Sequence, residues 1–200
     1  MPASDARYAA IKTARSRTPR HFDRPQSSDG RILSAKEYFG INTFTDREWG
    51  SGIEEPALFR PTAFDADQWV RSFRDAGMKL VLLTAKHHDG FCLWPSPFSR
   101  TARTDKWNAA VVGPRRDLLG ELFAAGAKRG LKMGIYYSLY EWHHPLWLAD
   151  RSRYVAEHLH PQFKDVVTRY KPWFIFLDGE WEMDFAKWRS LELAAWLYNE

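Results

Sequence analysis

Residues 79–90 read KLVLLTAKHHDG, a run of apolar side chains that ends abruptly in polar ones. A continuous apolar stretch such as Leu80 to Leu83 is typical of a parallel β-strand that is covered on both faces. Three further short apolar runs occur along the chain. We therefore expect four strands, at residues 38–44, 79–85, 132–138 and 174–177.

An amphipathic segment follows each of these runs. The clearest begins with Asp65 and Gln68, which form a capping-box pattern, and ends at Gly77. We expect four such helices, at residues 65–77, at 117–130, at 161–170 after Pro161, and around Trp188, Leu191 and Leu197. Four successive strand-then-helix units predict a parallel α/β sheet with right-handed crossovers.

Polar and aromatic side chains follow the end of every expected strand. They are Glu48 and Trp49, then residues 86–90, residues 141–144 and residues 178–181. Reactive groups at the carboxyl ends of successive parallel strands are typical of the active face of a (βα) barrel. No glycine-rich nucleotide-binding turn follows the first strand. Because a complete barrel takes about 250 residues, we predict a partial (βα)8 TIM-like barrel of about four βα units.

The positive charge of the chain is concentrated at one end. The net charge is +4, from 29 basic and 25 acidic residues, and residues 1–24 contain six basic and two acidic residues, so the remainder is balanced. Residues 1–32 show no sustained hydrophobic periodicity. We therefore predict a basic flexible arm over residues 1–32 and the truncated barrel over residues 33–200. The isoelectric point near 9.2 therefore reflects the arm and does not indicate a nucleic-acid partner.

The chain has one cysteine, Cys92, and so forms no internal disulfide. No window approaches 18 consecutive apolar residues, and the first 22 residues lack the apolar segment of a secretory signal. We therefore expect a cytoplasmic protein with no membrane partner.

Asp178 is the candidate nucleophile or base, because it directly follows an apolar strand and would emerge at the rim of the core. The alternative is an Asp that caps the next helix or holds a loop.

Two adjacent histidines, His87 and His88, follow the second strand. Successive side chains on a strand point to opposite faces, so we expect one of the two rings at the site. Zinc binding with Cys92 or Asp89 fits no familiar spacing, whereas neutral histidines that hydrogen-bond sugar hydroxyls suit the pattern better. The second pair, at residues 143–144, is expected in a solvated turn.

Ten tryptophans are present in 200 residues. A monosaccharide pocket combines flat apolar rings with polar acceptors, and Glu48, Trp49, Trp142 and Trp181 offer this combination. The alternative is that these rings cover the rim of the barrel. A nucleophilic serine is not supported, because no Gly-x-Ser-x-Gly occurs.

Five blocks of sequence carry a more specific signal: NTFTDREWG at 42–50, LTAKHHDGFCLW at 83–94, GPRRDL at 113–118, YYS at 136–138 and FLDG at 176–179. Together they resemble the catalytic domain of retaining α-L-fucosidases of glycoside hydrolase family 29. The resemblance extends from about Leu33 to the C-terminus, and the KHHDGF block is its most specific part.

This resemblance implies a (βα)8-like barrel that removes terminal α-L-fucose from a fucosylated glycan or glycoside by two displacements. Asp178 would be the nucleophile that forms a covalent glycosyl-enzyme intermediate. The resemblance implies no cofactor and no metal. The residues that match the fucose pocket of the family are Glu48, Trp49, His87, His88 and Tyr136.

The chain differs from the family pattern in three places. Tyr38 stands where a pocket histidine is usual, and Phe176 stands where a Trp commonly precedes the nucleophile by two positions. The general acid/base of the family comes from further along the barrel than Glu200, and Glu141 and Glu180 are the candidates to replace it. Retaining hydrolysis needs two carboxyl groups about 5–5.5 Å apart, so the lack of that region would impair turnover.

Four strands also leave two open sheet edges, which favour pairing with another copy. We therefore expect a homo-oligomer. The alternative to a glycosidase is a non-catalytic fucose-binding or self-assembling half-barrel module that retains the pocket residues without turnover.

Overall fold

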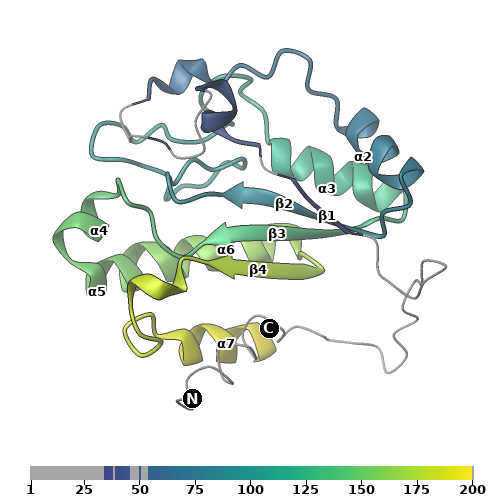
Figure 1. The fold of residues 1–200 in the computed structure, drawn as a ribbon. Helices are drawn as coiled ribbons and strands as arrows, with labels where there is room; N and C mark the ends of the chain where they lie inside the picture. The colour runs from purple at the N-terminus through teal and green to yellow at the C-terminus, as the bar shows by residue number, and fades with distance from the viewer. Residues whose placement is uncertain (1–33, 38, 46–49, 51–53, 200) are drawn as a thin grey trace.

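The computed structural model describes residues 34–37, 39–45, 50 and 54–199. Its centre is a four-stranded parallel sheet in the order β1-β2-β3-β4 (Figure 1). The strands are β1 (Ser34–Glu37), β2 (Leu80–Lys86), β3 (Lys132–Ser138) and β4 (Phe174–Asp178). The predicted parallel α/β architecture is confirmed, and the predicted arm at residues 1–32 lies outside the described residues.

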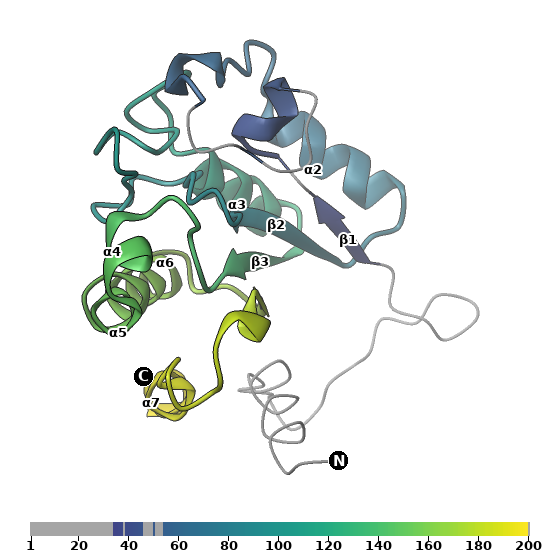
Figure 2. The same ribbon diagram turned by 60° about the vertical axis from the view of Figure 1, so that its left-hand side comes forward.

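A helix follows each strand, as expected. These helices are α2 (Ala66–Asp75), α3 (Leu118–Lys128), α6 (His160–Tyr170) and α7 (Ser190–Asn199). Right-handed crossovers between neighbouring parallel strands place successive helices on the same side of the sheet. The four helices accordingly follow one another around its outside (Figure 1, Figure 2).

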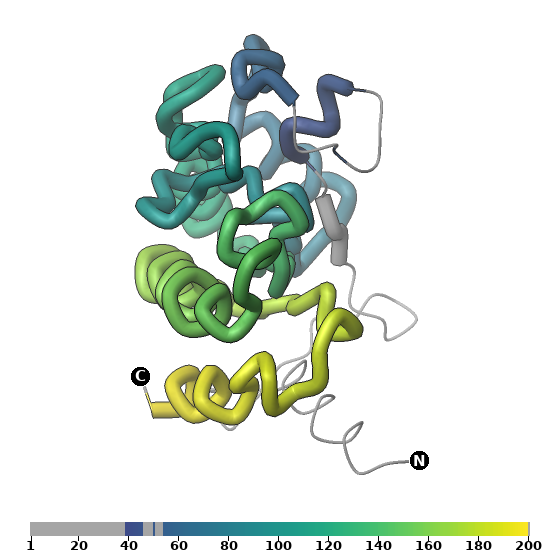
Figure 3. Tube along the Cα trace, turned by 90° about the vertical axis from the view of Figure 1, so that its left-hand side faces the viewer, coloured from purple at the N-terminus to yellow at the C-terminus, as the bar shows by residue number. Residues whose placement is uncertain are grey.

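Shorter helical segments occupy the connections. They are η1 (Ile41–Phe44), η2 (Pro56–Leu58), α4 (Pro145–Ala149), α5 (Arg151–Arg153), the π-helix η3 (Tyr154–Leu159) and η4 (Glu180–Glu182). Figure 3 looks onto the end of the sheet at which the strands finish, with the segment after β3 (green) between those after β2 (teal) and β4 (yellow).

The two faces of strand β4 differ in burial. In β4, Ile175 and Leu177 are buried, whereas Phe174, Phe176 and Asp178 are half-buried. The same alternation of period two places Tyr137 of β3 against Phe163 of α6, with ring centroids 5.4 Å apart. We call the face that the helices cover the outer face and the opposite one the inner face. Asp178 therefore lies on the inner face, at the carboxyl end of its strand.

The expected first strand at residues 38–44 is wrong. The strand lies earlier, at Ser34–Glu37, where it pairs in parallel with residues 80–83 of β2. Ile41 and Asn42 are buried in the 3-10 helix η1 rather than in the sheet. An apolar run of this length signals burial without specifying a strand, and here the burial occurs in a loop over the sheet end.

The start of α2 follows its sequence signal in part. The Asp65 Oδ1 atom accepts a hydrogen bond from the Gln68 N–H at 3.0 Å, while the Gln68 side chain donates to Ser72 Oγ.

The expected last helix is α7, but it begins after Trp188, and Leu191 is 56% exposed rather than packed. None of the helices in the described part of the chain has the length and apolar character that a membrane crossing requires.

Candidate active site

Asp178 and Tyr136 meet at the carboxyl ends of β4 and β3. Tyr136 is paired in register with Phe176, two residues before Asp178, so both polar groups lie on the inner face. The Tyr136 hydroxyl donates a hydrogen bond of 2.5 Å to Asp178 Oδ2, and the Gly179 N–H donates one of 3.0 Å to Oδ1. Both carboxylate oxygens are thus held while the side chain stays half-buried. An oriented, accessible carboxylate is what a nucleophile requires.

The turn after Asp178 depends on Gly179. Its φ of +86° is in the left-handed region, which favours glycine. A Cβ at this position would also lie 2.5 Å from Cδ1 of Tyr140. Glycine therefore lets the chain leave β4 sharply while the Tyr140 ring packs directly against the turn.

His87 and His88 both lie on the same side, contrary to the expectation that only one would. Their ring centroids are 4.4 Å apart, and the His87 ring stacks on Tyr136 at 5.7 Å. The reason is that β2 ends at Lys86, and the next residues form a turn closed by the Gly90 N–H to the His87 carbonyl at 3.0 Å. The strand alternation therefore does not extend to these residues.

The tautomer of His88 follows from its contacts. Its Nδ1 lies 2.6 Å from Ser138 Oγ, and the Ser138 hydroxyl donates its proton to the Tyr140 carbonyl at 2.6 Å. Ser138 must therefore accept from the His88 Nδ1–H. In the neutral ring, Nε2 is then a hydrogen-bond acceptor, which suits a hydroxyl of a sugar. Ser138, the last residue of β3, was not singled out from the sequence, although its place at a strand end is the signal that marks it.

Aromatic rings surround His88. The His88 centroid lies 4.6 Å from Tyr140, 5.5 Å from Trp142 and 5.9 Å from Trp181. Trp181 is 62% exposed, so it presents a flat apolar surface beside the turn that follows Asp178. Two other predicted pocket residues, Glu48 and Trp49, lie outside the described residues.

The second histidine pair is not a solvated turn. His144 is 1% exposed and caps α4, where its Nδ1 accepts a hydrogen bond from the Leu146 N–H at 3.1 Å. Burial lowers the pKa of His144 to about 3. The glutamate three residues before it, Glu141, is also 1% exposed and forms an ion pair with Lys86. Glu141 therefore cannot protonate a leaving group, which removes it as a replacement acid/base.

Asp89 links the histidine turn to η1. Its Oδ2 accepts a hydrogen bond from Asn42 Nδ2 at 3.0 Å, and its Oδ1 accepts one from the Phe91 N–H at 2.7 Å. Burial raises the pKa of Asp89 from 3.8 to about 7, and the charges of Glu54 and Glu141 add to this rise. Asp89 is thus a structural carboxyl group that changes charge near neutral pH.

A separate cavity of about 600 Å³ lies between residues 54–60 and residues 101–115. Arg60, Arg103 and Arg115 are among its lining residues, and none of the described site residues borders it.

Comparisons with known proteins agree with this geometry. The α-L-fucosidase family profile matches residues 24–200. The chain belongs to the α-L-fucosidase family. It is 47% identical over 148 residues to tissue α-L-fucosidase of Rattus norvegicus. This alignment covers 71% of this chain and 31% of the relative. It is 42% identical over 183 residues to α-L-fucosidase of Dictyostelium discoideum. That alignment covers 86% of this chain and 37% of the relative. The chain thus spans about a third of the length of these fucosidases.

Solved structures of fucosidases are similar in fold. A glycoside hydrolase family 29 member from an unknown rumen bacterium is 34% identical with a TM-score of 0.64, over 74% of this chain and 26% of that one. A family 29 α-L-fucosidase from Bacteroides thetaiotaomicron, trapped as a covalent intermediate with 2-fluoro-fucosyl fluoride, is 26% identical with a TM-score of 0.64. That alignment covers 76% of this chain and 40% of the other.

Proposed function

We propose that this chain carries the nucleophile and fucose-binding part of a retaining α-L-fucosidase, built on a partial (βα)8 barrel. The observation that carries the proposal is the carboxylate of Asp178, held on its two oxygens by Tyr136 and Gly179 at the end of β4. Its surroundings, with imidazoles on one side and the exposed Trp181 ring nearby, suit a terminal deoxy sugar that has both hydroxyls and apolar C–H faces.

The reaction would proceed in two displacements at the anomeric carbon. An oxygen of Asp178 attacks this carbon, the bond to the aglycone oxygen breaks, and a covalent fucosyl-aspartate forms. Water then attacks the same carbon and releases fucose with its original configuration. His88, as a neutral acceptor at Nε2, would accept a hydrogen bond from a fucose hydroxyl. A second carboxyl group must protonate the aglycone oxygen, and Glu180 remains the candidate for it among the residues proposed from the sequence.

The test uses a substrate that does not need this second group. In 2-fluoro-fucosyl fluoride the leaving group is fluoride, which departs with little help from an acid, and the 2-fluoro substituent slows hydrolysis of the adduct. Intact-mass spectrometry of the full chain should show one added fluoro-fucosyl group, and peptide mapping after digestion should place it on the peptide that contains Asp178. The Asp178→Asn variant should add none, and Asp184→Asn, a nearby exposed carboxylate, should add one as in the parent chain.

The outcome separates the two functions. If the parent chain gains no mass while L-fucose still binds in calorimetry, the chain is a fucose-binding module and the catalytic proposal is wrong. If the mass is gained at another residue, the assignment of the nucleophile is wrong.

We also propose that the chain self-associates. β1 and β4 are the edges of the sheet in the described residues, and exposed edges favour pairing with a further strand. Light scattering of the full chain should give a mass of at least twice 23.4 kDa. A stable monomer would contradict this proposal without affecting the assignment of the site.

A further inference from the structure

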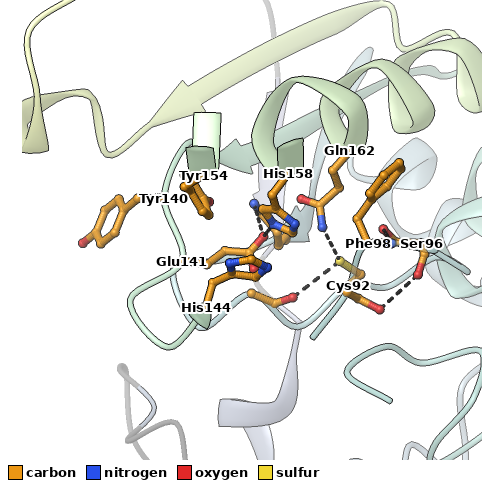
Figure 4. Close-up of polar contacts among 12 residues, drawn as sticks. Cys92, Ser96, Phe98, Tyr140, Glu141, His144, Tyr154, His158 and Gln162 are labelled. Carbon is orange, nitrogen blue, oxygen red and sulfur yellow. Dashed lines mark hydrogen bonds and ion pairs between the residues drawn. The ribbon is translucent and has the colours of Figure 1, made fainter. Parts of the chain in front are cut away.

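A buried charged cluster lies directly behind the histidine turn. Glu141 Oε1 accepts two hydrogen bonds of 2.7 Å, one from Lys86 Nζ and one from His158 Nε2. Lys86 is fully buried, and Glu141 and His158 are 1% and 3% exposed. Figure 4 shows the Glu141 side chain between His144 and His158, whereas the preceding Tyr140 points away from them.

Glu141 is ionised in this cluster. Burial alone would raise its pKa, but the nearby charges of His158 and Lys86 outweigh burial and lower the pKa to about 2. An ionised carboxylate only accepts hydrogen bonds, so both neighbours must donate to it. Removing charges from water costs several kcal/mol, and a buried ion pair of this kind is often no more stable than a packed apolar pair. The cluster therefore needs an explanation beyond stability.

A metal ion does not explain it. The ligand atoms of Glu141, His144 and His158 lie within 4.8 Å of one another, which is compatible with a cation in spacing alone. However, the Nδ1 lone pair of His144 is used by the Leu146 N–H, so its Nε2 carries the proton and cannot bind a metal. The Lys86 ammonium also lies 2.7 Å from Glu141 Oε1, so a cation at this carboxylate would meet a positive charge at close range.

The cluster instead contacts the turn that carries the two pocket histidines. Lys86 directly precedes His87, and a register shift between Thr84 and Lys86 pairs Lys86 with Tyr137 of the outer face. This shift turns the Lys86 side chain away from the inner face and toward the cluster, as a bulge does. The turn is thereby anchored at the residue that precedes it.

Two further contacts anchor the rest of the turn. The Trp142 N–H, one residue after Glu141, donates to the His88 carbonyl at 3.1 Å. Gly90, with a φ of +78°, packs against the carboxylate so closely that a Cβ there would lie 2.6 Å from Glu141 Oε2. Lys86 before the turn, and His88 and Gly90 within it, therefore all contact Glu141 or the residue next to it.

We propose that Glu141 is a positioning residue, whose ionised carboxylate acts through Lys86 and Gly90 to fix the imidazoles of His87 and His88 in the fucose pocket. That the pocket binds fucose rests on the proposed function. That Glu141 orients the two imidazole rings does not rest on it, because the orientation can be measured without any substrate.

The experiment compares the full chain with its Glu141→Gln variant, which keeps the size of the side chain and removes its charge. Imidazole nitrogen NMR reports the tautomer of His88, which the Ser138 contact fixes with the proton on Nδ1. We expect the variant to lose this single tautomer and to show averaged nitrogen shifts. We expect its affinity for L-fucose, measured by calorimetry, to fall about 10-fold, which corresponds to the loss of about one hydrogen bond to the sugar.

A control removes a half-buried carboxylate from another part of the chain. Asp165 Oδ2 accepts a hydrogen bond from the Trp94 indole at 2.9 Å, and its Oδ1 accepts one from Arg169 at 2.8 Å, so both of these bonds lie outside the histidine turn. Asp165→Asn should lower the melting temperature and leave the His88 signals unchanged. If Glu141→Gln does not fold, His158→Leu removes one donor, keeps the Lys86 contact and should give a smaller change of the same kind.

Three results separate the possibilities. A folded Glu141→Gln variant with unchanged His88 signals overturns the proposal. Equal changes in Asp165→Asn also overturn it, because they indicate general loosening. Changed His88 signals in a chain whose parent does not bind L-fucose would support the positioning role and contradict the proposed function.

Discussion

Asp89 gives the fold a predictable dependence on pH. Its carboxyl group is 2% exposed, and burial raises its pKa from 3.8 to about 7. Between these values the folded chain holds a proton that the unfolded chain has lost. The unfolded state thus binds fewer protons, so this group makes the free energy of unfolding fall as the pH rises from about 4 to about 7. Its stabilising contribution is complete below pH 4 and is lost above pH 7.

The size of the effect follows from the shift of about three pKa units. Each unit corresponds to about 1.4 kcal/mol, so the full contribution is about 4 kcal/mol. That is a large part of the 5–15 kcal/mol of a typical domain. The Asp89→Asn variant keeps the shape of the side chain and stays neutral at every pH. The parent chain should therefore lose stability relative to this variant by about 1.4 kcal/mol per pH unit over this range.

Urea unfolding of both chains at intervals from pH 4 to pH 8 measures this difference directly. Other titrating groups, such as His144, act in both chains and cancel in the comparison. The carboxyl carbon signal of Asp89, assigned by its absence in the variant, gives its pKa independently. A difference in stability that stays constant with pH, or that changes in favour of the parent chain as the pH rises, would refute the reasoning.

Two further predictions concern the site and its supporting turn. Tyr136→Phe removes the hydrogen bond to Asp178. Because a hydrogen bond to a charged group contributes about 1.5–3 kcal/mol, labelling by 2-fluoro-fucosyl fluoride should slow about 10- to 100-fold. An unchanged labelling rate in the mass assay would show that this hydrogen bond does not affect the nucleophile. Gly90→Ala and Gly130→Ala both introduce a Cβ at positive φ, +78° and +70°, but only the first meets Glu141, and nothing lies within 4 Å at the second. Gly90→Ala should therefore be the more destabilising by about 1–3 kcal/mol in urea unfolding; equal losses would show that the carboxylate moves aside freely.

Much of the sheet can be predicted from local patterns. The sequence predicts β3 at residues 132–138, and the structure has it at those residues. Asp65 also begins its helix as expected. These elements are predictable because each depends on contacts that its own residues specify: a continuous run of buried residues in the strand, and a side-chain cap at the start of the helix.

The region around the histidine turn is less predictable, because it depends on how distant segments fit together. A strict period of two would place Lys86 on the inner face with Leu82 and Thr84. The one-residue register shift before Lys86 reverses its direction, and no local pattern marks where such a shift occurs. For the same reason the sequence suggests a solvated turn for His144, whose burial is set by packing against His158, with ring centroids 3.9 Å apart.

Asp178 and Glu141 show how the sheet assigns different roles to similar residues. Both are carboxylates beside aromatic side chains near strand ends, and the sequence treats both as candidates for chemistry. Asp178 is on the open inner face, where Tyr136 and Gly179 orient it without burying it. Glu141 is enclosed, and its Oε1 accepts hydrogen bonds from Lys86 and His158. Accessibility to a substrate, rather than residue type or spacing, therefore separates the proposed nucleophile from the residue that supports the pocket.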